Sequence, residues 1–377
     1  MPLSIVIAAG GTGGHIFPGL ALAGAIRELA PDARVAFVGT PRGLERSLIP
    51  ARGYPLYLVG MRPFTRSLGM KPILGVLSMF RATVQARRIL RSVRASAVVG
   101  MGGYASLPVV VAAWRLGIPR IVHESGAVPG LANRVAARFT RDVALSFPDA
   151  AGRFPRRTRT RVVGTPLSPE LAGVDRIALR AEGRRAYRLP QTVTAVLVLG
   201  GSLGAMRLNE VGVGLAARWR ERDDLRVVLK AGRDHLDTIR AEVTELGADQ
   251  VVTTVAFIDR MDEAYAAADV ALCRAGAGTV AELAAGGVPA VVVPYPHAPD
   301  DHQTKNAAAL VRAGAAVLVP DGEATADRIA PILEELAADP ARRERMSKAA
   351  RELARPDAAR ELARWVLHRA GRRSEAL

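Results

Sequence analysis

A histidine follows a cluster of glycines near the start of the chain, a combination suited to acid-base chemistry on an anionic ligand. The segment Gly10-Gly11-Thr12-Gly13-Gly14-His15 comes directly after an apolar run. Glycines at such a turn let a ligand approach the backbone, and the N–H groups of a following helix attract anions. A neutral imidazole, with an ordinary pKa of about 6.5, can take a proton from a hydroxyl. We interpret His15 as a candidate general base; a capping or packing role is the alternative.

Three more glycine-rich loops occur along the chain: Gly100-Met101-Gly102-Gly103-Tyr104, Gly200-Gly201-Ser202-Leu203-Gly204 and Gly276-Ala277-Gly278-Thr279. The loop at 200–204 also follows an apolar run and precedes a helical pattern, so we expect it to bind a diphosphate. Tight packing of a strand against a helix uses glycine as well. A purely structural role therefore stays open for each loop.

Polar side chains follow the last glycine loop. Glu282 is expected in the first turn or so of a helix that opens at Thr279, where its carboxylate can accept from both hydroxyls of a ribose. A surface glutamate that stabilises the helix dipole is the alternative. Downstream, Gln303 and Asn306 carry amides that match sugar hydroxyls, unless they only begin a helix.

Several other chemistries are excluded. A nicotinamide site requires G-x-G-x-x-G and an acidic residue after the second strand, but that strand ends Phe37-Val38-Gly39-Thr40 and the last glycine is missing. There is no G-x-x-x-x-G-K-[ST] segment either. The six histidines are widely spaced, and the single cysteine, Cys273, cannot form an internal disulfide. We expect no metal and no cofactor.

Composition is that of a globular protein with an anionic partner. Of 377 residues, 49% are hydrophobic and 23% charged, and the formal net charge is +16. Aromatic residues make up only 5% and the arginines are scattered, so we expect no nucleic acid and a largely solvated arginine surface. The first nine residues resemble a strand and not a signal peptide, and no stretch reaches about 20 apolar residues. We therefore expect a cytoplasmic protein.

These loops must be positioned by strands and helices that alternate along the chain, as in parallel α/β sheets. The unit of strand, glycine turn and helix recurs after about 190 residues, which predicts two Rossmann-like domains with ligands at the carboxyl ends of the strands. The end of the chain, 327–373, reads as two or three helices broken near Pro340 and Pro356. Strands are predicted at 3–9, 34–38, 97–99, 119–122 and 143–146, and, after a poorly periodic stretch at 152–191, at 193–199, 225–229, 251–257, 269–273, 288–293 and 315–319.

An amphipathic segment between residues 73 and 94 fits a helix that lies on an anionic membrane surface. A plain amphipathic core helix is the alternative. Its apolar face comprises Ile73, Leu74, Val76, Leu77, Phe80 and Val84, and its arginines are Arg81, Arg87, Arg88, Arg91 and Arg94.

Taken together, the motifs resemble the MurG family of glycosyltransferases over nearly the whole chain. These inverting enzymes transfer GlcNAc from UDP-GlcNAc to the 4-hydroxyl of the muramyl sugar of undecaprenyl-diphospho-MurNAc-pentapeptide in peptidoglycan synthesis. The carriers of the resemblance are 10–15 with Phe17-Pro18-Gly19, 100–104, His123-Glu124, 200–205, Phe257-Ile258-Asp259, 273–282 and 302–306.

The resemblance implies an α/β fold of the GT-B type, two Rossmann-like parallel-sheet domains facing across a cleft. Residues 1–164, joined by a C-terminal helix at about 357–377, would form the acceptor and membrane domain, and residues 165–356 the UDP-sugar-binding domain. It also implies peripheral attachment to the cytoplasmic face of the cell membrane.

Site residues follow from the same resemblance. The catalytic residue would be His15. The donor would contact Ser202, Gly201, Gly204, Ile258, Ala277, Gly278, Thr279, Glu282, Gln303 and Asn306, and the acceptor side would comprise Thr12, Gly13, Gly14, Gly102, Gly103, Tyr104 and Glu124.

Three positions depart from the family pattern: Gly126 replaces an asparagine, Ser168 an arginine and Leu203 a glutamine. Alternatives are therefore a paralogue with another lipid-linked or sugar acceptor and a non-catalytic UDP-sugar-binding protein. A UDP-GlcNAc 2-epimerase is a third, but we cannot place its acid and base carboxylates.

Overall fold

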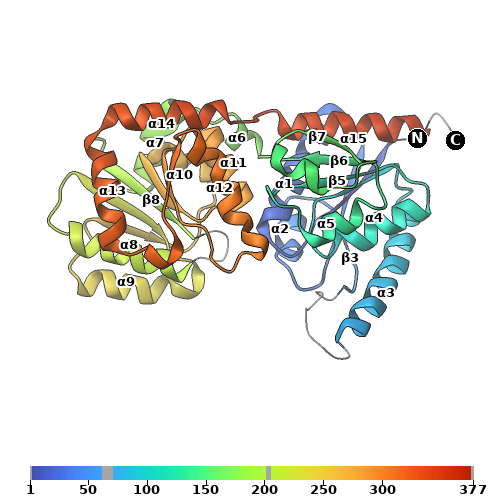
Figure 1. The fold of residues 1–377 in the computed structure, drawn as a ribbon, viewed down its shortest axis with the longest axis horizontal. Helices are drawn as coiled ribbons and strands as arrows, with labels where there is room; N and C mark the ends of the chain where they lie inside the picture. The colour runs from blue at the N-terminus through green and yellow to red at the C-terminus, as the bar shows by residue number, and fades with distance from the viewer. Residues whose placement is uncertain (1, 62–70, 201–204, 375–377) are drawn as a thin grey trace. The chain divides into compact units, whose positions relative to one another are not determined.

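The chain divides into two compact units, each built on one parallel sheet (Figure 1). The computed structural model describes residues 2–61, 71–200 and 205–374, without the side chains of 71–76 and 372–374. The first unit comprises Met1–Ser168 and Arg355–Leu377, and the second comprises Pro169–Ala354.

The first unit contains a seven-stranded sheet of order β3-β2-β1-β4-β5-β6-β7. Apolar runs form the buried central strands because helices cover both faces of a parallel sheet. The order reverses between β1 and β4, and ligands bind at such a reversal, beyond the carboxyl ends of the strands. The strands are β1 (Ser4–Ala8), β2 (Arg34–Gly39), β3 (Leu56–Leu58), β4 (Ala97–Gly100), β5 (Arg120–Glu124), β6 (Asp142–Leu145) and β7 (Arg159–Val162).

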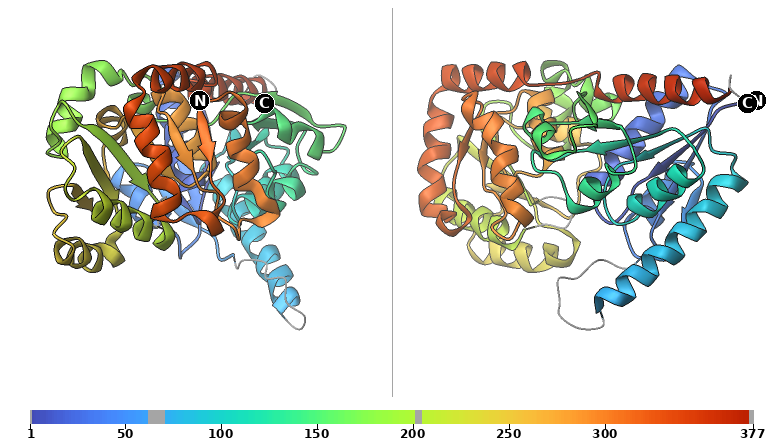
Figure 2. Two further views of the ribbon diagram at one scale, coloured as in Figure 1. Left: turned by 60° about the vertical axis from the view of Figure 1, so that its left-hand side comes forward. Right: turned by 45° about the vertical axis from the view of Figure 1, so that its right-hand side comes forward.

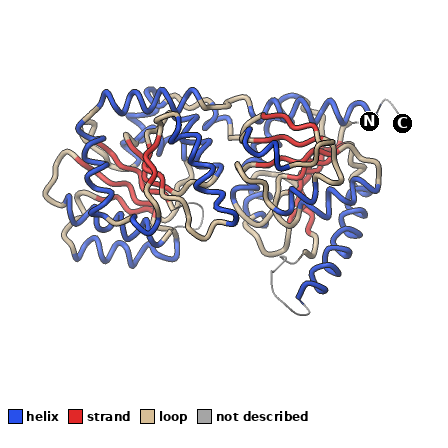
Figure 3. Tube along the Cα trace, viewed as in Figure 1, coloured by secondary structure: helices blue, strands red, loops and turns tan. Residues whose placement is uncertain are grey.

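Helices pack on both faces of this sheet, as the tube in Figure 3 shows. On one face, α1 and α15 enclose a core that includes Ile5, Phe37 and Val366; on the other, α3 and α4 pack against Val6 and Val98. The helical elements are α1 (Gly13–Leu29), α2 (Glu45–Ala51), α3 (Lys71–Ser92), α4 (Ser106–Arg115), α5 (Leu131–Ala136), the 3₁₀ helix η1 (Pro148–Arg153) and α15 (Ala358–Ser374).

The second unit repeats the plan with a six-stranded sheet of order β10-β9-β8-β11-β12-β13. Trp219 is a large buried residue of its core. The strands are β8 (Thr194–Leu199), β9 (Leu225–Lys230), β10 (Val252–Val255), β11 (Val270–Cys273), β12 (Ala290–Val292) and β13 (Ala316–Leu318). The helices are α6 (Pro169–Ala172), α7 (Arg176–Ala186), α8 (Met206–Trp219), η2 (Arg233–His235), α9 (Leu236–Glu245), α10 (Met261–Ala267), α11 (Ala277–Gly286), η3 (Pro299–Asp301), α12 (His302–Arg312), η4 (Asp321–Glu323), α13 (Ala326–Ala338) and α14 (Pro340–Glu352).

The predicted class, two parallel-sheet α/β domains, is confirmed. All eleven predicted strands are present, and the last three helices break at Asp339 and near Pro356 as predicted. Two strands were missed: β3 has only three residues, too few to show a pattern, and β7 is an edge strand rich in exposed arginine. The stretch at 152–191 also contains α7, which was missed because four arginines and a glutamate interrupt its apolar residues.

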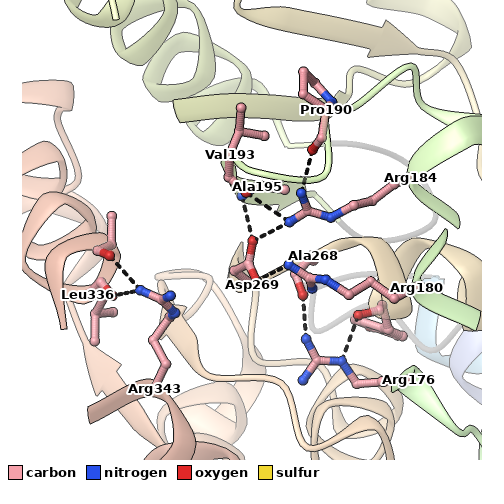
Figure 4. A network of polar contacts seen from close by, with 12 residues as sticks. Arg176, Arg180, Arg184, Pro190, Val193, Ala195, Ala268, Asp269, Leu336 and Arg343 are labelled. Atoms are coloured by element: carbon pink, nitrogen blue, oxygen red, sulfur yellow. Dashed lines mark hydrogen bonds and ion pairs between the residues drawn. The ribbon is translucent and has the colours of Figure 1, made fainter. Parts of the chain in front are cut away.

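Arginines of α7 hold that helix on the sheet of the second unit (Figure 4). Arg184 is fully buried and donates to Asp269 Oδ2 at 2.7 Å and to the Val193 carbonyl at 2.9 Å. Arg180 donates to Asp269 Oδ1 at 2.8 Å. Asp269 Oδ2 also accepts from the N–H of Ala195 at 2.8 Å, so one carboxylate joins α7 to β8.

Candidate active site

His15 lies in the first turn of α1, beyond the carboxyl end of β1. The chain turns between them at Gly11, whose φ of +91° favours glycine. Thr12 Oγ1 lies 3.3 Å from His15 Nδ1. No side chain caps α1, and its first turn has no acidic residue, which suits an approaching anion.

The second glycine loop packs directly against the imidazole. Gly102 and Gly103 have φ values of +101° and +74°. A Cβ placed on Gly102 would lie 2.8 Å from His15 Cδ2, and one on Gly103 would lie 3.2 Å from His15 Nδ1. The structure therefore brings together His15 and these two glycines, and a larger residue at either position would displace the ring. Tyr104 is exposed beside them.

The surroundings of His15 favour its neutral form. Burial lowers the pKa of His15 below its ordinary value, while the Gly10 carbonyl and the carboxylate of Glu45 oppose that shift in pKa. A neutral imidazole can accept a proton at neutral pH, as a general base must. Sequence reasoning missed Glu45, because nothing in its spacing from residue 15 indicates that α2 returns to this loop.

His123 and Glu124 end β5 and are both buried. His123 Nε2 lies 3.0 Å from the Gly164 carbonyl, and burial lowers the pKa of His123 to about 4. Glu124 accepts from the N–H groups of Gly126 and Gly130 at 2.8 and 3.1 Å and from Asn133 Nδ2 at 2.9 Å. The Glu124 carboxylate thus holds the loop that follows β5. Sequence reasoning missed Asn133, because an asparagine inside a short helix carries no motif.

In the second unit, α11 begins at Ala277 and not at Thr279 as predicted, because the turn after β11 ends at Gly276. Glu282 therefore lies in the second turn of this helix, slightly further along than the first turn or so that was predicted. Ala277, Gly278 and Thr279 form the first turn instead. Gly201, Ser202, Leu203 and Gly204 lie outside the described residues.

The helices after the two glycine loops of this unit lack caps that other helices have. Neither α8 nor α11 has a side-chain cap or an acidic residue in its first turn. By contrast, Asp175, Thr325 and Asp339 cap α7, α13 and α14. Uncapped helix N-termini present N–H groups to an anion. The helices α4, α5 and α12 lack such caps too, so α8 and α11 are candidate anion sites because each also follows a glycine loop at the end of a strand.

Glu282 is half-buried on α11, and Tyr265 Oη donates to its Oε2 at 2.9 Å. Burial raises the pKa of Glu282, and the positive charge of Lys230 opposes that rise in pKa. Lys230 ends β9, with its Nζ 5.3 Å from the centre of the Phe257 ring, and the neighbouring Ile258 is buried. Sequence reasoning missed Tyr265 and Lys230 as partners of Glu282, because packing of α10 against α11 and the order of strands in the sheet bring them together.

The amides of α12 hold the loop that precedes α11. Gln303 Oε1 accepts from the N–H groups of Ala275 and Tyr295 at 3.2 and 2.9 Å. Asn306 Nδ2 donates to the Ala275 carbonyl at 3.1 Å. These bonds position the start of α11 for whatever it binds.

Other reactive groups in the described residues contribute little. Cys273 is buried on β11, and burial raises the pKa of its thiol to about 12, so it is no nucleophile. Across residues 2–61, 71–200 and 205–374, no three His, Cys, Asp or Glu side chains are grouped so as to hold a metal ion.

Family models match both units. The N-terminal domain model of glycosyltransferase family 28 matches residues 5–145, and the C-terminal domain model matches residues 195–362. The chain belongs to glycosyltransferase family 28. Membership of family 28 makes it a glycosyltransferase, as the sequence predicted.

Named relatives agree with this membership. A Nocardioides protein described as UDP-N-acetylglucosamine–N-acetylmuramyl-(pentapeptide) pyrophosphoryl-undecaprenol N-acetylglucosamine transferase is 43% identical over 366 residues, covering 97% of this chain and 98% of its own. The crystal structure of Acinetobacter baumannii MurG superposes with a TM-score of 0.75 at 31% identity, covering 98% of this chain and all of its own.

A more distant likeness concerns the fold alone. The UDP-GlcNAc 2-epimerase of Neisseria meningitidis superposes with a TM-score of 0.68 at 12% identity, covering 97% of this chain and all of its own. Family 28 thus shares its architecture with enzymes of another reaction class.

Proposed function

We propose that the chain transfers GlcNAc from UDP-GlcNAc to the 4-hydroxyl of the muramyl sugar of undecaprenyl-diphospho-MurNAc-pentapeptide. The observation that carries this proposal is the near-complete coverage of a relative named for that reaction, at 43% identity. His15 on its glycine loop and the uncapped helix α11 support it, because the reaction needs a base and a site for a diphosphate.

In the proposed step, the oxygen of the muramyl hydroxyl bonds to the anomeric carbon of GlcNAc, and His15 takes the proton of that hydroxyl. The bond from that carbon to the diphosphate breaks, and UDP leaves with the electron pair, so the anomeric configuration inverts. Charge develops on the diphosphate, and backbone N–H groups at α8 and α11 stabilise it in place of a cation. The first unit thereby serves the acceptor and the second the donor.

The deciding experiment mixes purified protein, UDP-GlcNAc and the lipid-linked muramyl acceptor and follows UDP release. We expect UDP release that depends on the acceptor. Free UDP-ManNAc formed without acceptor would show an epimerase instead. UDP binding without turnover on any lipid-linked acceptor would show a binding protein.

Glu282 is proposed to accept from the ribose hydroxyls of the donor. Replacing it with glutamine retains an acceptor for Tyr265 and removes the charge. Because a hydrogen bond to a charged group contributes about 1.5–3 kcal/mol, we expect Glu282→Gln to weaken UDP binding by about tenfold or more. Calorimetric titration with UDP and 2′-deoxy-UDP measures this effect.

The paired ligands make the Glu282 experiment specific. The unaltered protein should prefer UDP over 2′-deoxy-UDP, and the variant should lose most of that preference. Glu242→Gln, an exposed glutamate on α9 of the same unit, is the matched control. An undiminished preference for UDP over 2′-deoxy-UDP in Glu282→Gln would contradict the assignment of Glu282 to the ribose.

Peripheral attachment to the cytoplasmic face of the membrane is proposed through α3. Ala82, Ala86 and Leu90 of this helix pack in the core, as the core-helix alternative expects, but Leu77 and Phe80 are 44% and 60% exposed. Exposed arginines follow at Arg81, Arg87 and Arg88. Figure 2 shows α3 reaching beyond the sheet of its unit. The side chains of Ile73, Leu74 and Val76 lie outside the described residues. No described helix is long and apolar enough to span a membrane.

Vesicle flotation tests this surface. We expect the protein to float with vesicles containing anionic lipid and to float less with neutral ones, because both apolar contact and charge contribute. Phe80→Ser should weaken flotation, whereas Trp114→Ser, an exposed aromatic residue on α4, should not. Equal flotation with neutral and anionic vesicles would count against the proposed role of the arginines.

A further inference from the structure

Glu45 of α2 is a fully buried carboxylate that joins two loops at the carboxyl ends of β1 and β2. Its Oε2 accepts from the N–H of Gly11 at 3.1 Å. Its Oε1 accepts from the N–H and the hydroxyl of Thr40 at 2.9 and 2.7 Å. Nothing in the proposed reaction uses this side chain directly.

Three glycines leave room for this carboxylate. A Cβ on Gly10 would lie 2.7 Å from Glu45 Oε1, one on Gly39 would lie 2.7 Å from Glu45 Cγ, and one on Gly43 would lie 1.8 Å from Glu45 Oε2. Any side chain at these positions would displace the carboxylate. The chain thus accommodates a buried charge beside the His15 loop, and burying a charge is costly unless it is well bonded.

One peptide unit connects Glu45 to His15. The N–H of the Gly10–Gly11 peptide donates to Glu45, and the carbonyl of the same peptide, on Gly10, faces the imidazole. A Cβ on Gly103 would lie 2.6 Å from this carbonyl oxygen and 3.2 Å from His15 Nδ1, so the two groups are packed together. Glycine peptides reorient easily, so a bond at the N–H also fixes the direction of the carbonyl.

We propose that Glu45 is a positioning residue, whose carboxylate acts through the Gly10–Gly11 peptide to orient the His15 ring. A carbonyl held in this direction selects which ring nitrogen carries the proton and leaves the other free to accept one. This inference rests on the proposed function, in which His15 is the base. The charged or titratable groups that act on the imidazole are Glu45 from α2 and His123 from β5, and the loop at 100–104 places glycines against it.

The test compares Glu45→Gln with the unaltered protein by NMR titration of the histidine rings, with His15→Ala identifying the His15 signal. Loss of the negative charge should lower the pKa of His15 by about 0.5 or more. The kcat should fall about tenfold, and the acid limb of kcat/KM should move to lower pH. Glu28→Gln, at the far end of α1 and exposed, should change neither.

A second variant separates charge from reach. Glu45→Asp keeps the charge but shortens the side chain, so the hydrogen bond from the N–H of Gly11 should be lost and kcat should fall about tenfold. Because the negative charge remains, the pKa of His15 should be higher in Glu45→Asp than in Glu45→Gln. A folded Glu45→Gln with an unchanged His15 pKa, or a folded Glu45→Asp with unchanged kcat, overturns the proposal. If His15→Ala retains turnover, the assignment of the base fails, while the NMR titration still reports whether Glu45 acts on the ring.

Discussion

Replacing His15 with alanine is expected to lower kcat by about 10² or more, because proton transfer by a positioned base contributes about that much. UDP affinity should stay unchanged, since His15 lies in the first unit and the groups proposed to hold UDP lie in the second. Steady-state kinetics with the lipid-linked acceptor, together with calorimetric UDP binding, measures both quantities. His368→Ala, an exposed histidine on α15, is the control and should behave as the unaltered protein.

The pH dependence gives an independent check on His15. Burial lowers the pKa of His15 below 6.5, and a base must be neutral, so activity should be fully present above pH 6.5 and be lost as pH falls through the lowered pKa. Burial lowers the pKa of His123 to about 4, so this ring is neutral near pH 6.5 as well. Full turnover by His15→Ala, or an acid limb centred above pH 6.5, would contradict the role of His15 as base.

Replacing Asp269 with alanine is expected to lower the free energy of unfolding by about 3–5 kcal/mol, the usual result of removing one partner of a buried ion pair. Arg184 is fully buried and would keep its charge without a carboxylate, and the N–H of Ala195 would lose its acceptor (Figure 4). Urea denaturation followed by circular dichroism measures the change.

An exposed ion pair of the same unit is the matched control for Asp269. Arg222 makes a bidentate contact with Asp224, in which Nε donates to Oδ1 at 2.6 Å and Nη2 donates to Oδ2 at 2.7 Å. The side chains of Arg222 and Asp224 are 45% and 54% exposed. Asp224→Ala should therefore cost about 0–1 kcal/mol. Combining Asp269→Ala with Arg184→Met should recover part of the lost stability, because the buried charge is then gone. Equal small losses at Asp269 and Asp224 would show that burial adds nothing to the Asp269 contacts.

Local pattern was sufficient to predict the main elements and the loops that carry the candidate chemistry. Apolar runs become buried strands, and a glycine turn between a strand and a helix lies at a predictable edge of a parallel sheet. For that reason the loops at 10–15 and 276–279 could be placed from residue types alone, and only the start of α11 was misjudged. The helix α7 in the stretch at 152–191 escaped because arginines make its contacts with the sheet, while one of its few large apolar residues, Ile177, is 90% exposed.

Only the tertiary structure shows which distant side chains act on these loops. Glu45 reaches the loop of His15 because α2 follows the neighbouring strand. Tyr265 reaches Glu282 because α10 packs against α11, and Lys230 ends β9, which only β8 separates from β11. Each of these partners sits in sequence among ordinary helix or strand residues. Hydrogen bonds and charges act over a few ångströms in space, and that proximity arises from strand order and helix packing, which no local pattern of residues contains.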